Sequence, residues 1–122
     1  MLKILNSEID KTIKYLNSEY PVNKEVFLHI CEGYDTIKTD TGVGFGAFVK
    51  SISNENPPVI YIAGDMPNDD YQMIEALAHE YRHFLQWCNG EEFSEEQAEI
   101  FGKQVAAKLF KLPERRLLDD KT

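Results

Sequence analysis

Residues 76–89 read ALAHEYRHFLQWCN and contain two histidines four positions apart, with a glutamate directly after the first. Apolar residues recur through and around this stretch at the spacing of one helix face. They are Ile74, Leu77, Ala78, Tyr81, Leu85 and Cys88. Asn68 can cap such a helix, and Asn89-Gly90 is a typical C-terminal stop signal. The sequence therefore predicts a helix between these two signals, with its histidines beside the apolar stripe.

Three β-prone segments precede this predicted helix. They comprise residues 26–31, 44–52 and 59–63. Residues 33–42, GYDTIKTDTG, are rich in turn-forming residues and are predicted to form a loop after the first strand. Glycines in the second strand indicate a bulge or a close approach of another segment to the backbone.

Two further helices are predicted at the ends of the chain. The first has apolar residues at helical spacing up to Leu16 and is closed by Pro21. The last begins at a capping box formed by Ser94 and Gln97 and continues until Pro113. The order helix, three strands, helix, helix predicts a single α+β domain over residues 1–122, with residues 113–122 as a flexible tail.

Composition narrows the classes of protein to consider. The chain has 122 residues, of which 43% are hydrophobic, enough for one core. A net charge of −8 argues against nucleic acid as a partner and fits a basic peptide or protein surface better. No apolar run is long enough to span a membrane, the N-terminus does not resemble a signal peptide, and the two cysteines form no CxxC motif. A cytoplasmic protein is expected.

The histidine pair has the spacing of a metal site. Positions i and i+4 share one helix face, so His79 and His83 can present their imidazoles to one ion. A catalytic zinc ion keeps three protein ligands and an open position for water, and Glu80 can accept the proton of that water. With 3 histidines among 122 residues, shuffled sequences contain H-E-x-x-H on the order of once in 200. The alternative is a pair of solvated histidines on an exposed helix face.

The third ligand is expected downstream, at the start of the last predicted helix. The candidates are Glu91, Glu92, Glu95, Glu96 and Glu99. If this helix packs antiparallel to the first, a register that sets Glu95 level with His83 also sets Glu99 level with His79. Glu95 is then the predicted ligand, and Glu99 is a hydrogen-bonding partner of the far nitrogen of His79 and the main rival as ligand. Capping electrostatics accounts for the other three glutamates.

The strings VIYI, ALAHEYRHFLQ and EEQAEIFG together resemble the gluzincin metallopeptidases, which carry HExxH and a downstream glutamate signature on the next helix. The closest resemblance is to short ImmA/IrrE-like proteins and minimal single-domain gluzincins, over roughly residues 57–112. It implies a minimal zincin-like domain that binds Zn2+. The residues that it implies are His79, His83 and Glu95 as zinc ligands, Glu80 as catalytic base and Glu99 as the acid behind the ligands.

The activity implied by this resemblance is that of a zinc-dependent endopeptidase acting on a protein or peptide substrate. The candidates for stabilising the developing oxyanion are Tyr61, Tyr71, Tyr81 and Arg82. The segment GFGAFVK, residues 44–50, can bind substrate by edge pairing, or its glycines can serve packing alone. His29 is predicted to be a surface or packed histidine and not a ligand.

Two other functions fit the same residues. One is a catalytically silent zinc-binding interaction module of the same fold, and the other is a small structural protein without metal. The glutamate at position 80 favours hydrolysis, because a purely structural site has no use for a base beside an open ligand position. The predicted tail carries Asp119 and Asp120. Either a carboxylate from this tail occupies the open zinc position and makes the enzyme latent, or the tail is simply a disordered terminus.

Overall fold

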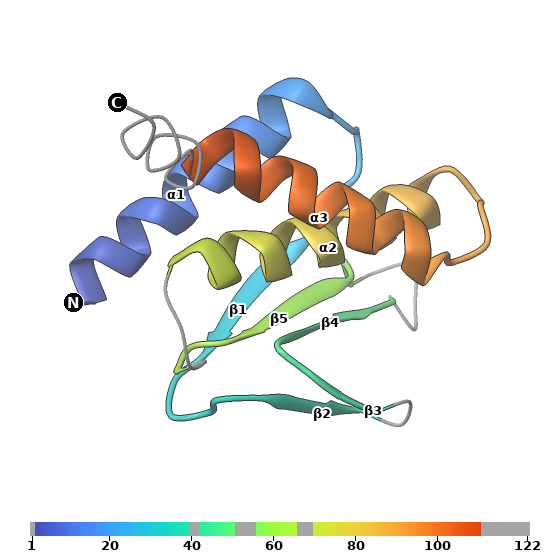
Figure 1. The fold of residues 1–122 in the computed structure, drawn as a ribbon. Coiled ribbons are helices and arrows are strands. Elements are labelled where there is room, and N and C mark those ends of the chain that lie inside the picture. Colours follow the sequence, from blue (N-terminus) through green and yellow to red (C-terminus); the bar gives the residue numbers. More distant parts are fainter. Residues whose placement is uncertain (1, 40–41, 51–55, 66–69, 111–122) are drawn as a thin grey trace.

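The computed structural model describes residues 2–39, 42–50, 56–65 and 70–110 (Figure 1). The expected cap Asn68 and the expected tail 113–122 lie outside these ranges. The described residues form an α+β fold of helices and two small sheets. In chain order the elements are α1 (Leu2–Glu19), β1 (Phe27–Cys31), β2 (Ile37–Thr39), β3 (Gly42–Gly44), β4 (Gly46–Val49), β5 (Val59–Ala63), α2 (Asp70–Cys88) and α3 (Glu95–Phe110).

The larger sheet has the strand order β1-β5-β4, with β5 parallel to β1 and antiparallel to β4. The alternation of VIYIA turns Ile60 and Ile62 toward α2, where 2% and 0% of these residues remain exposed. Leu28 and Phe48 flank Ile60 on the two neighbouring strands. The central strand is thus the apolar floor of the core, and β4 is left at the sheet edge.

The prediction of a loop over residues 33–42 is wrong for the second half of this range. Ile37–Thr39 pairs with Gly42–Gly44 as an antiparallel hairpin. A three-residue strand is too short to show an alternating pattern, and its pairing partner consists of two glycines and a valine, which have no strand signature of their own. Of the second predicted strand, 44–52, residues Gly46–Val49 form β4, whereas Gly44 belongs to the hairpin and residues 51–52 lie outside the described ranges.

Helix α2 is the centre of the molecule. It packs against β4 and β5 on one side and against α1 and α3 on the others (Figure 1). The predicted apolar stripe is confirmed, because Ile74, Leu77, Ala78 and Tyr81 are buried. Phe84, which is only 1% exposed, belongs to the same buried core. Because α2 is packed on several sides, the positions of its polar side chains are fixed by the neighbouring helices and strands.

Both ends of the connection between α2 and α3 are capped as predicted. Gly90 has a positive φ of 70°, and the backbone N–H of Glu91 donates to Gln86 O at 2.9 Å, as in a Schellman motif. At the other end the backbone N–H of Gln97 donates to Ser94 Oγ at 3.2 Å, which is one half of the predicted capping box. The reciprocal bond from Ser94 N to the Gln97 side chain is not formed among the residues that the structure describes, because Ser94 N donates to Gln86 Oε1 instead. The chain therefore reverses within a few residues and returns along α2.

The return is antiparallel and close. Lys103, late in α3, contacts Glu75, early in α2, with Nζ and Oε2 3.2 Å apart. Arg82, late in α2, donates to Gln97 Oε1 near the start of α3 at 3.2 Å. A Cβ atom at Gly102 would lie 2.8 Å from the carbonyl oxygen of Glu75. The small residue at this position is therefore what allows the two helices to meet.

Two further observations concern the cysteines and the hydrophobicity of the helices. Cys31 and Cys88 are both free and half-buried. No helix within the described ranges is long and apolar enough to cross a membrane.

Candidate metal centre

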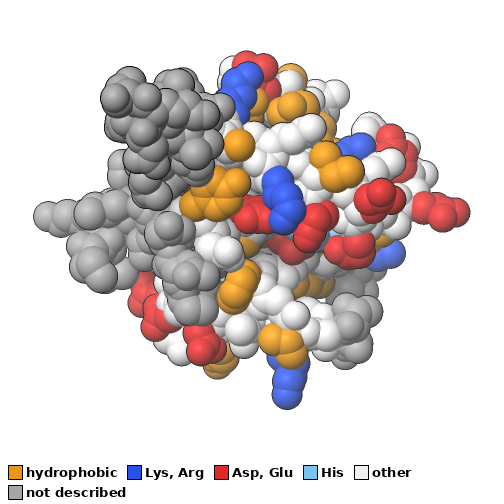
Figure 2. Space-filling model, in the orientation of Figure 1, with side chains coloured by type: hydrophobic (Ala, Val, Ile, Leu, Met, Phe, Trp, Pro, Cys, Tyr) orange, Lys and Arg blue, Asp and Glu red, His pale blue; other side chains and the backbone are white. Residues whose placement is uncertain are grey.

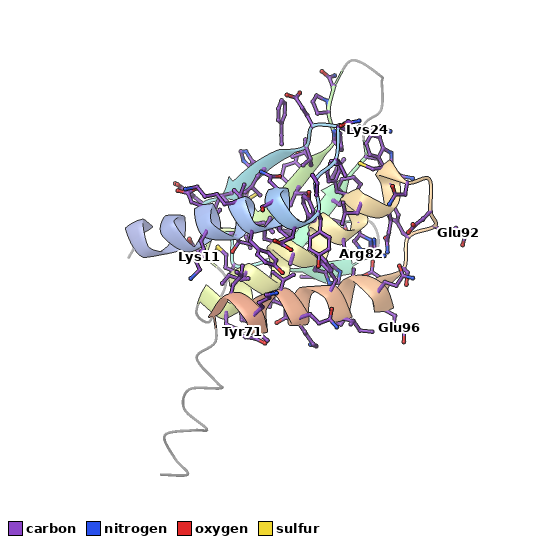
Figure 3. The ribbon with its side chains drawn as sticks, turned by 90° about the horizontal axis from the view of Figure 1, so that it is seen from above. Lys11, Lys24, Tyr71, Arg82, Glu92 and Glu96 are labelled. Carbon is purple, nitrogen blue, oxygen red and sulfur yellow. The ribbon has the colours of Figure 1, made fainter. Side chains whose placement is uncertain are left out.

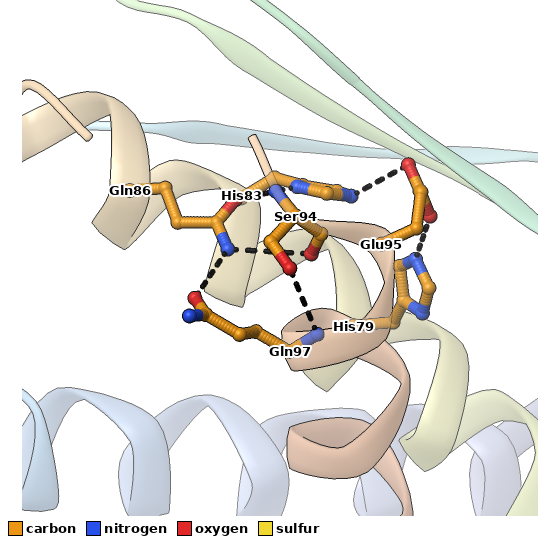
Figure 4. Close-up of polar contacts among 6 residues, drawn as sticks. All are labelled: His79, His83, Gln86, Ser94, Glu95 and Gln97. Carbon is orange, nitrogen blue, oxygen red and sulfur yellow. Dashed lines mark hydrogen bonds and ion pairs between the residues drawn. The ribbon is translucent and has the colours of Figure 1, made fainter. Parts of the chain in front are cut away.

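His79, His83 and Glu95 converge at the interface between α2 and α3 (Figure 4). His79 Nε2 lies 3.0 Å from Glu95 Oε1, and His83 Nε2 lies 3.1 Å from Glu95 Oε2. The three potential ligand atoms, one from each residue, all lie within 4.8 Å of one another. Glu95 reaches both rings because the antiparallel packing brings the first turn of α3 level with them.

The group faces a cleft of about 1050 Å³ lined by α2, the start of α3, strand β4 and the hairpin β2–β3. Burial changes steeply across the three side chains. The His83 side chain is 5% exposed and that of His79 is 22% exposed, whereas that of Glu95 is 80% exposed. The carboxylate thus lies on the solvent side of the two rings, and the group is reached from the cleft.

Glu80 lies between α2 and strand β4, is only 8% exposed, and also lines the cleft. Burial, with a smaller contribution from the charge of Glu95, raises the pKa of the Glu80 carboxyl to about 8. A Cβ atom at Gly46 would lie 3.0 Å from Glu80 Cγ, so the glycine leaves the room that this side chain occupies. The close backbone approach indicated by the glycines of this strand is confirmed here.

The other glutamates near the start of α3 do not join the group. Glu92 and Glu96 point outward into solvent (Figure 3), and Glu91 is exposed as well. Glu99 is exposed and lines the cleft, but no hydrogen bond between it and His79 occurs in the described part of the chain. Its role behind the ligands stays a prediction.

Charged residues of both signs line the cleft near Glu99. Lys103 is held by Glu75, and the neighbouring charge of Glu99 also helps to raise the pKa of the lysine. Figure 2 shows acidic side chains gathered around a basic one in the middle of this face of the molecule. Of the described residues, four glutamates and two lysines line the cleft, namely Glu75, Glu80, Glu95, Glu99, Lys50 and Lys103, so its charged lining is mainly acidic.

None of the four side chains predicted as oxyanion candidates lines the cleft. The Tyr81 hydroxyl donates to the backbone oxygen of Tyr20 at 2.8 Å, and Arg82 is bound to Gln97. Tyr61 packs edge-on against His29, with ring centroids 5.7 Å apart, on the sheet face turned away from α2. His29 is exposed there, as predicted for a histidine that is not a ligand.

Sequence reasoning missed Gln86, which is 0% exposed and contacts His83 directly. The distance from His83 Nδ1 to Gln86 Oε1 is 2.8 Å. Its amide also reaches Ser94 and Gln97, at the start of α3 (Figure 4). The available signal was a glutamine three residues after a candidate ligand.

Phe93 gives the site an aromatic wall. Its ring stacks on that of His83 with centroids 5.0 Å apart and an interplanar angle of 29°. It also packs against Phe48, and Lys50 Nζ lies 5.4 Å from its ring centroid. Phe93 remains 43% exposed and lines the cleft, so an apolar surface lies directly beside the candidate ligands.

Comparison of the chain with protein family models, with curated proteins and with solved structures found no match. The function has to be argued from the residues and geometry of the site alone.

Proposed function

We propose that the chain is a zinc-dependent peptidase with a minimal zincin-like, gluzincin-type domain. The observation that carries the proposal is the convergence of His79, His83 and Glu95 within 4.8 Å beside a cleft that also contains Glu80. Two imidazoles and a carboxylate are the donor set of one class of catalytic zinc sites. The spacing H-E-x-x-H alone predicts the histidines, and the packing of α3 supplies the carboxylate independently.

The geometry of these residues fits a divalent ion. The Glu95 carboxylate spans the two rings, with one oxygen near each Nε2 atom at 3.0 Å and 3.1 Å. Three protein ligands leave one position of a tetrahedral ion open, and a closed structural site would have used a fourth. The exposed side of this group faces the cleft, which is where a substrate would approach.

A zinc ion at this site supplies a Lewis acid that polarises a carbonyl group and makes water more acidic. The chain's own residues supply the rest. The Glu80 carboxyl, next to His79 in sequence and inside the cleft, would accept a proton from the attacking water in its ionised form, which the positive charge of a bound zinc ion favours, and return it to the leaving amine. Strand β4 packs against Glu80 at Gly46 and shields its side chain from solvent.

The substrate is proposed to be an extended peptide segment. Strand β4 is the edge strand of the larger sheet, and its residues line the cleft. An exposed edge offers backbone N–H and C=O groups to an added strand, which is a recurrent mode of peptide recognition. The aromatic wall at Phe93 provides an apolar surface for a side chain next to the scissile bond.

Metal content and metal-dependent cleavage together test the proposal. Purified protein is expected to contain about one zinc per chain, and it should cleave an unfolded protein substrate in a reaction that a chelator stops and zinc restores. Glu80→Gln should retain zinc and the fold but lose cleavage, because the amide is nearly isosteric and cannot act as a base.

The result also separates hydrolysis from the alternative of a silent zinc-binding module. If the parental protein and Glu80→Gln both bind zinc and neither cleaves the substrate, the result would favour the interaction module. Cleavage by Glu80→Gln at the parental rate would show that the mechanism is wrong. The absence of zinc from the parental protein after incubation with the metal would end the proposal.

A further inference from the structure

Gln86 connects the two helices that carry the candidate ligands, and its side chain is fully buried. Four hydrogen-bonding contacts surround its amide. Oε1 lies 2.8 Å from His83 Nδ1 and 3.3 Å from Ser94 N. Nε2 lies 3.3 Å from Ser94 O and 3.1 Å from Gln97 Oε1. The chemistry of these partners fixes which way the amide points.

The orientation can be read from groups that have only one possible role. The backbone N–H of Ser94 can only donate, so it requires the oxygen of Gln86 on its side, and the backbone oxygen of Ser94 can only accept, so it requires the NH2 group. Arg82 has no acceptor, which fixes Oε1 of Gln97 toward the guanidinium at 3.2 Å. This oxygen then needs the NH2 group of Gln86 as well.

The protonation of His83 follows from this orientation. Because Gln86 presents an oxygen, His83 Nδ1 has to carry the hydrogen, and in a neutral imidazole Nε2 then holds the lone pair. That lone pair is directed at Glu95 Oε2, 3.1 Å away. Two electron-rich atoms at such a distance repel each other unless a cation or a proton lies between them.

We infer that Gln86 is a positioning residue for the metal centre, an inference that rests on the proposed function. It holds His83 in the tautomer that presents Nε2 to an ion, and it fixes Ser94, the residue directly before Glu95. One buried amide thus sets a ligand on α2 and the start of α3 together. Partners of this kind orient metal-binding histidines, and their loss commonly weakens binding by about 10–100-fold.

The competing explanation is that Gln86 only satisfies buried backbone groups and stabilises the fold. Three substitutions separate these roles. Gln86→Met keeps a similar volume but removes every polar contact, including that with His83. Gln97→Met, the matched control, removes the contacts of the Gln97 amide with Gln86 and Arg82 and leaves the His83 contact in place. Gln86→Glu preserves an acceptor for His83 but removes the NH2 group that faces Ser94 O and Gln97 Oε1, so it separates the contact with His83 from the contacts with the start of α3.

The first measurement is the tautomer of neutral His83 in the metal-free protein, by NMR of the ring nitrogens. The hydrogen is expected on Nδ1 in the parent, in Gln97→Met and in Gln86→Glu, and on Nε2 in Gln86→Met, where Glu95 can accept it. A parent with the hydrogen on Nε2 would overturn the inference, whether or not zinc binds and whether or not Gln86→Met folds.

The second measurement is zinc affinity by competition with a coloured chelator. Gln86→Met should bind zinc about 10–100-fold more weakly, and Gln97→Met should stay close to the parent. Equal losses in both variants, in proportion to their loss of stability, would show that the role is structural and the inference wrong. A parent with the expected tautomer but no zinc binding would instead refute the proposed function, and with it the role of Gln86 toward the metal.

Discussion

The backbone of Gly46 lies against the side chain of Glu80, so closely that a Cβ atom on the glycine would be 3.0 Å from Glu80 Cγ. The same Cβ would lie 3.0 Å from Ile62 Cδ1 and 3.1 Å from Tyr61 O. The contact with a backbone oxygen cannot be relieved by rotating a side chain. Strand β4 and the Glu80 side chain can therefore pack this closely only because residue 46 is a glycine.

Gly46→Ala should accordingly impair the proposed catalysis more than metal binding. The added methyl group pushes the Glu80 side chain or strand β4 aside, and a displacement of about 1 Å at a reacting group can cost about 100-fold in rate. The measurement is the rate of peptide cleavage together with the zinc content. Gly44→Ala is the matched control, because a Cβ there would meet only Gly46 O at 3.8 Å. Equal activity in both variants would contradict the prediction.

Removal of either histidine should release most of the metal. His79→Ala or His83→Ala leaves two protein ligands, which cannot hold a catalytic zinc ion tightly. Zinc content after dialysis is the measurement. His29→Ala, on the far face of the sheet, removes an imidazole outside the cleft and should retain the zinc. Retention of stoichiometric zinc by the double variant His79→Ala, His83→Ala would show that the metal binds elsewhere.

Glu95 and Glu99 offer a paired test of the third ligand. Only the Glu95 carboxylate contacts both histidine rings, whereas Glu99 lies one turn further along α3 on an exposed position. Glu95→Ala should therefore weaken zinc binding severely, and Glu99→Ala should weaken it far less. Zinc affinity measured by competition decides between them. A larger loss in Glu99→Ala would transfer the ligand role to that residue and require a different position of α3.

Much of the fold was predictable because its signals are local. The periodicity and the stop signal at Asn89-Gly90 predict α2 up to Cys88, and Ser94 predicts the start of α3 within one residue. The central strand, 59–63, is confirmed over its whole predicted length. Such signals depend on a few neighbouring residues, so they can be read without knowing the rest of the structure.

The remaining features depend on contacts between distant segments. Thr39 and Gly42 pair at the end of a hairpin that has no hydrophobic alternation, and the order of the strands depends on which edges meet after folding. Gln86 was missed for a related reason. The role of a glutamine within an amphipathic helix is ambiguous until its partners on the returning helix are known, although its distance of three residues from His83 was a usable signal.

Gly102 allows a test of the close contact between α2 and α3. In an exposed helix, replacing glycine by alanine stabilises by about 1 kcal/mol, because alanine has the higher helix propensity. Here the added Cβ would lie 2.8 Å from the backbone oxygen of Glu75 and 3.4 Å from His79 Cβ. Since a backbone oxygen cannot turn away, the helices have to separate, and overpacking of this kind typically costs about 1–3 kcal/mol.

The net expectation for Gly102→Ala is a lower free energy of unfolding, measured by urea denaturation of the metal-free protein. Gln104→Ala, two residues further along α3 at an exposed position, is the control for helix propensity and should leave stability nearly unchanged. Zinc binding should weaken along with stability, because Glu95 moves with α3 while His79 stays on α2. An increase in stability of about 1 kcal/mol, the full propensity gain, would show that the two helices are less tightly packed than the structure indicates.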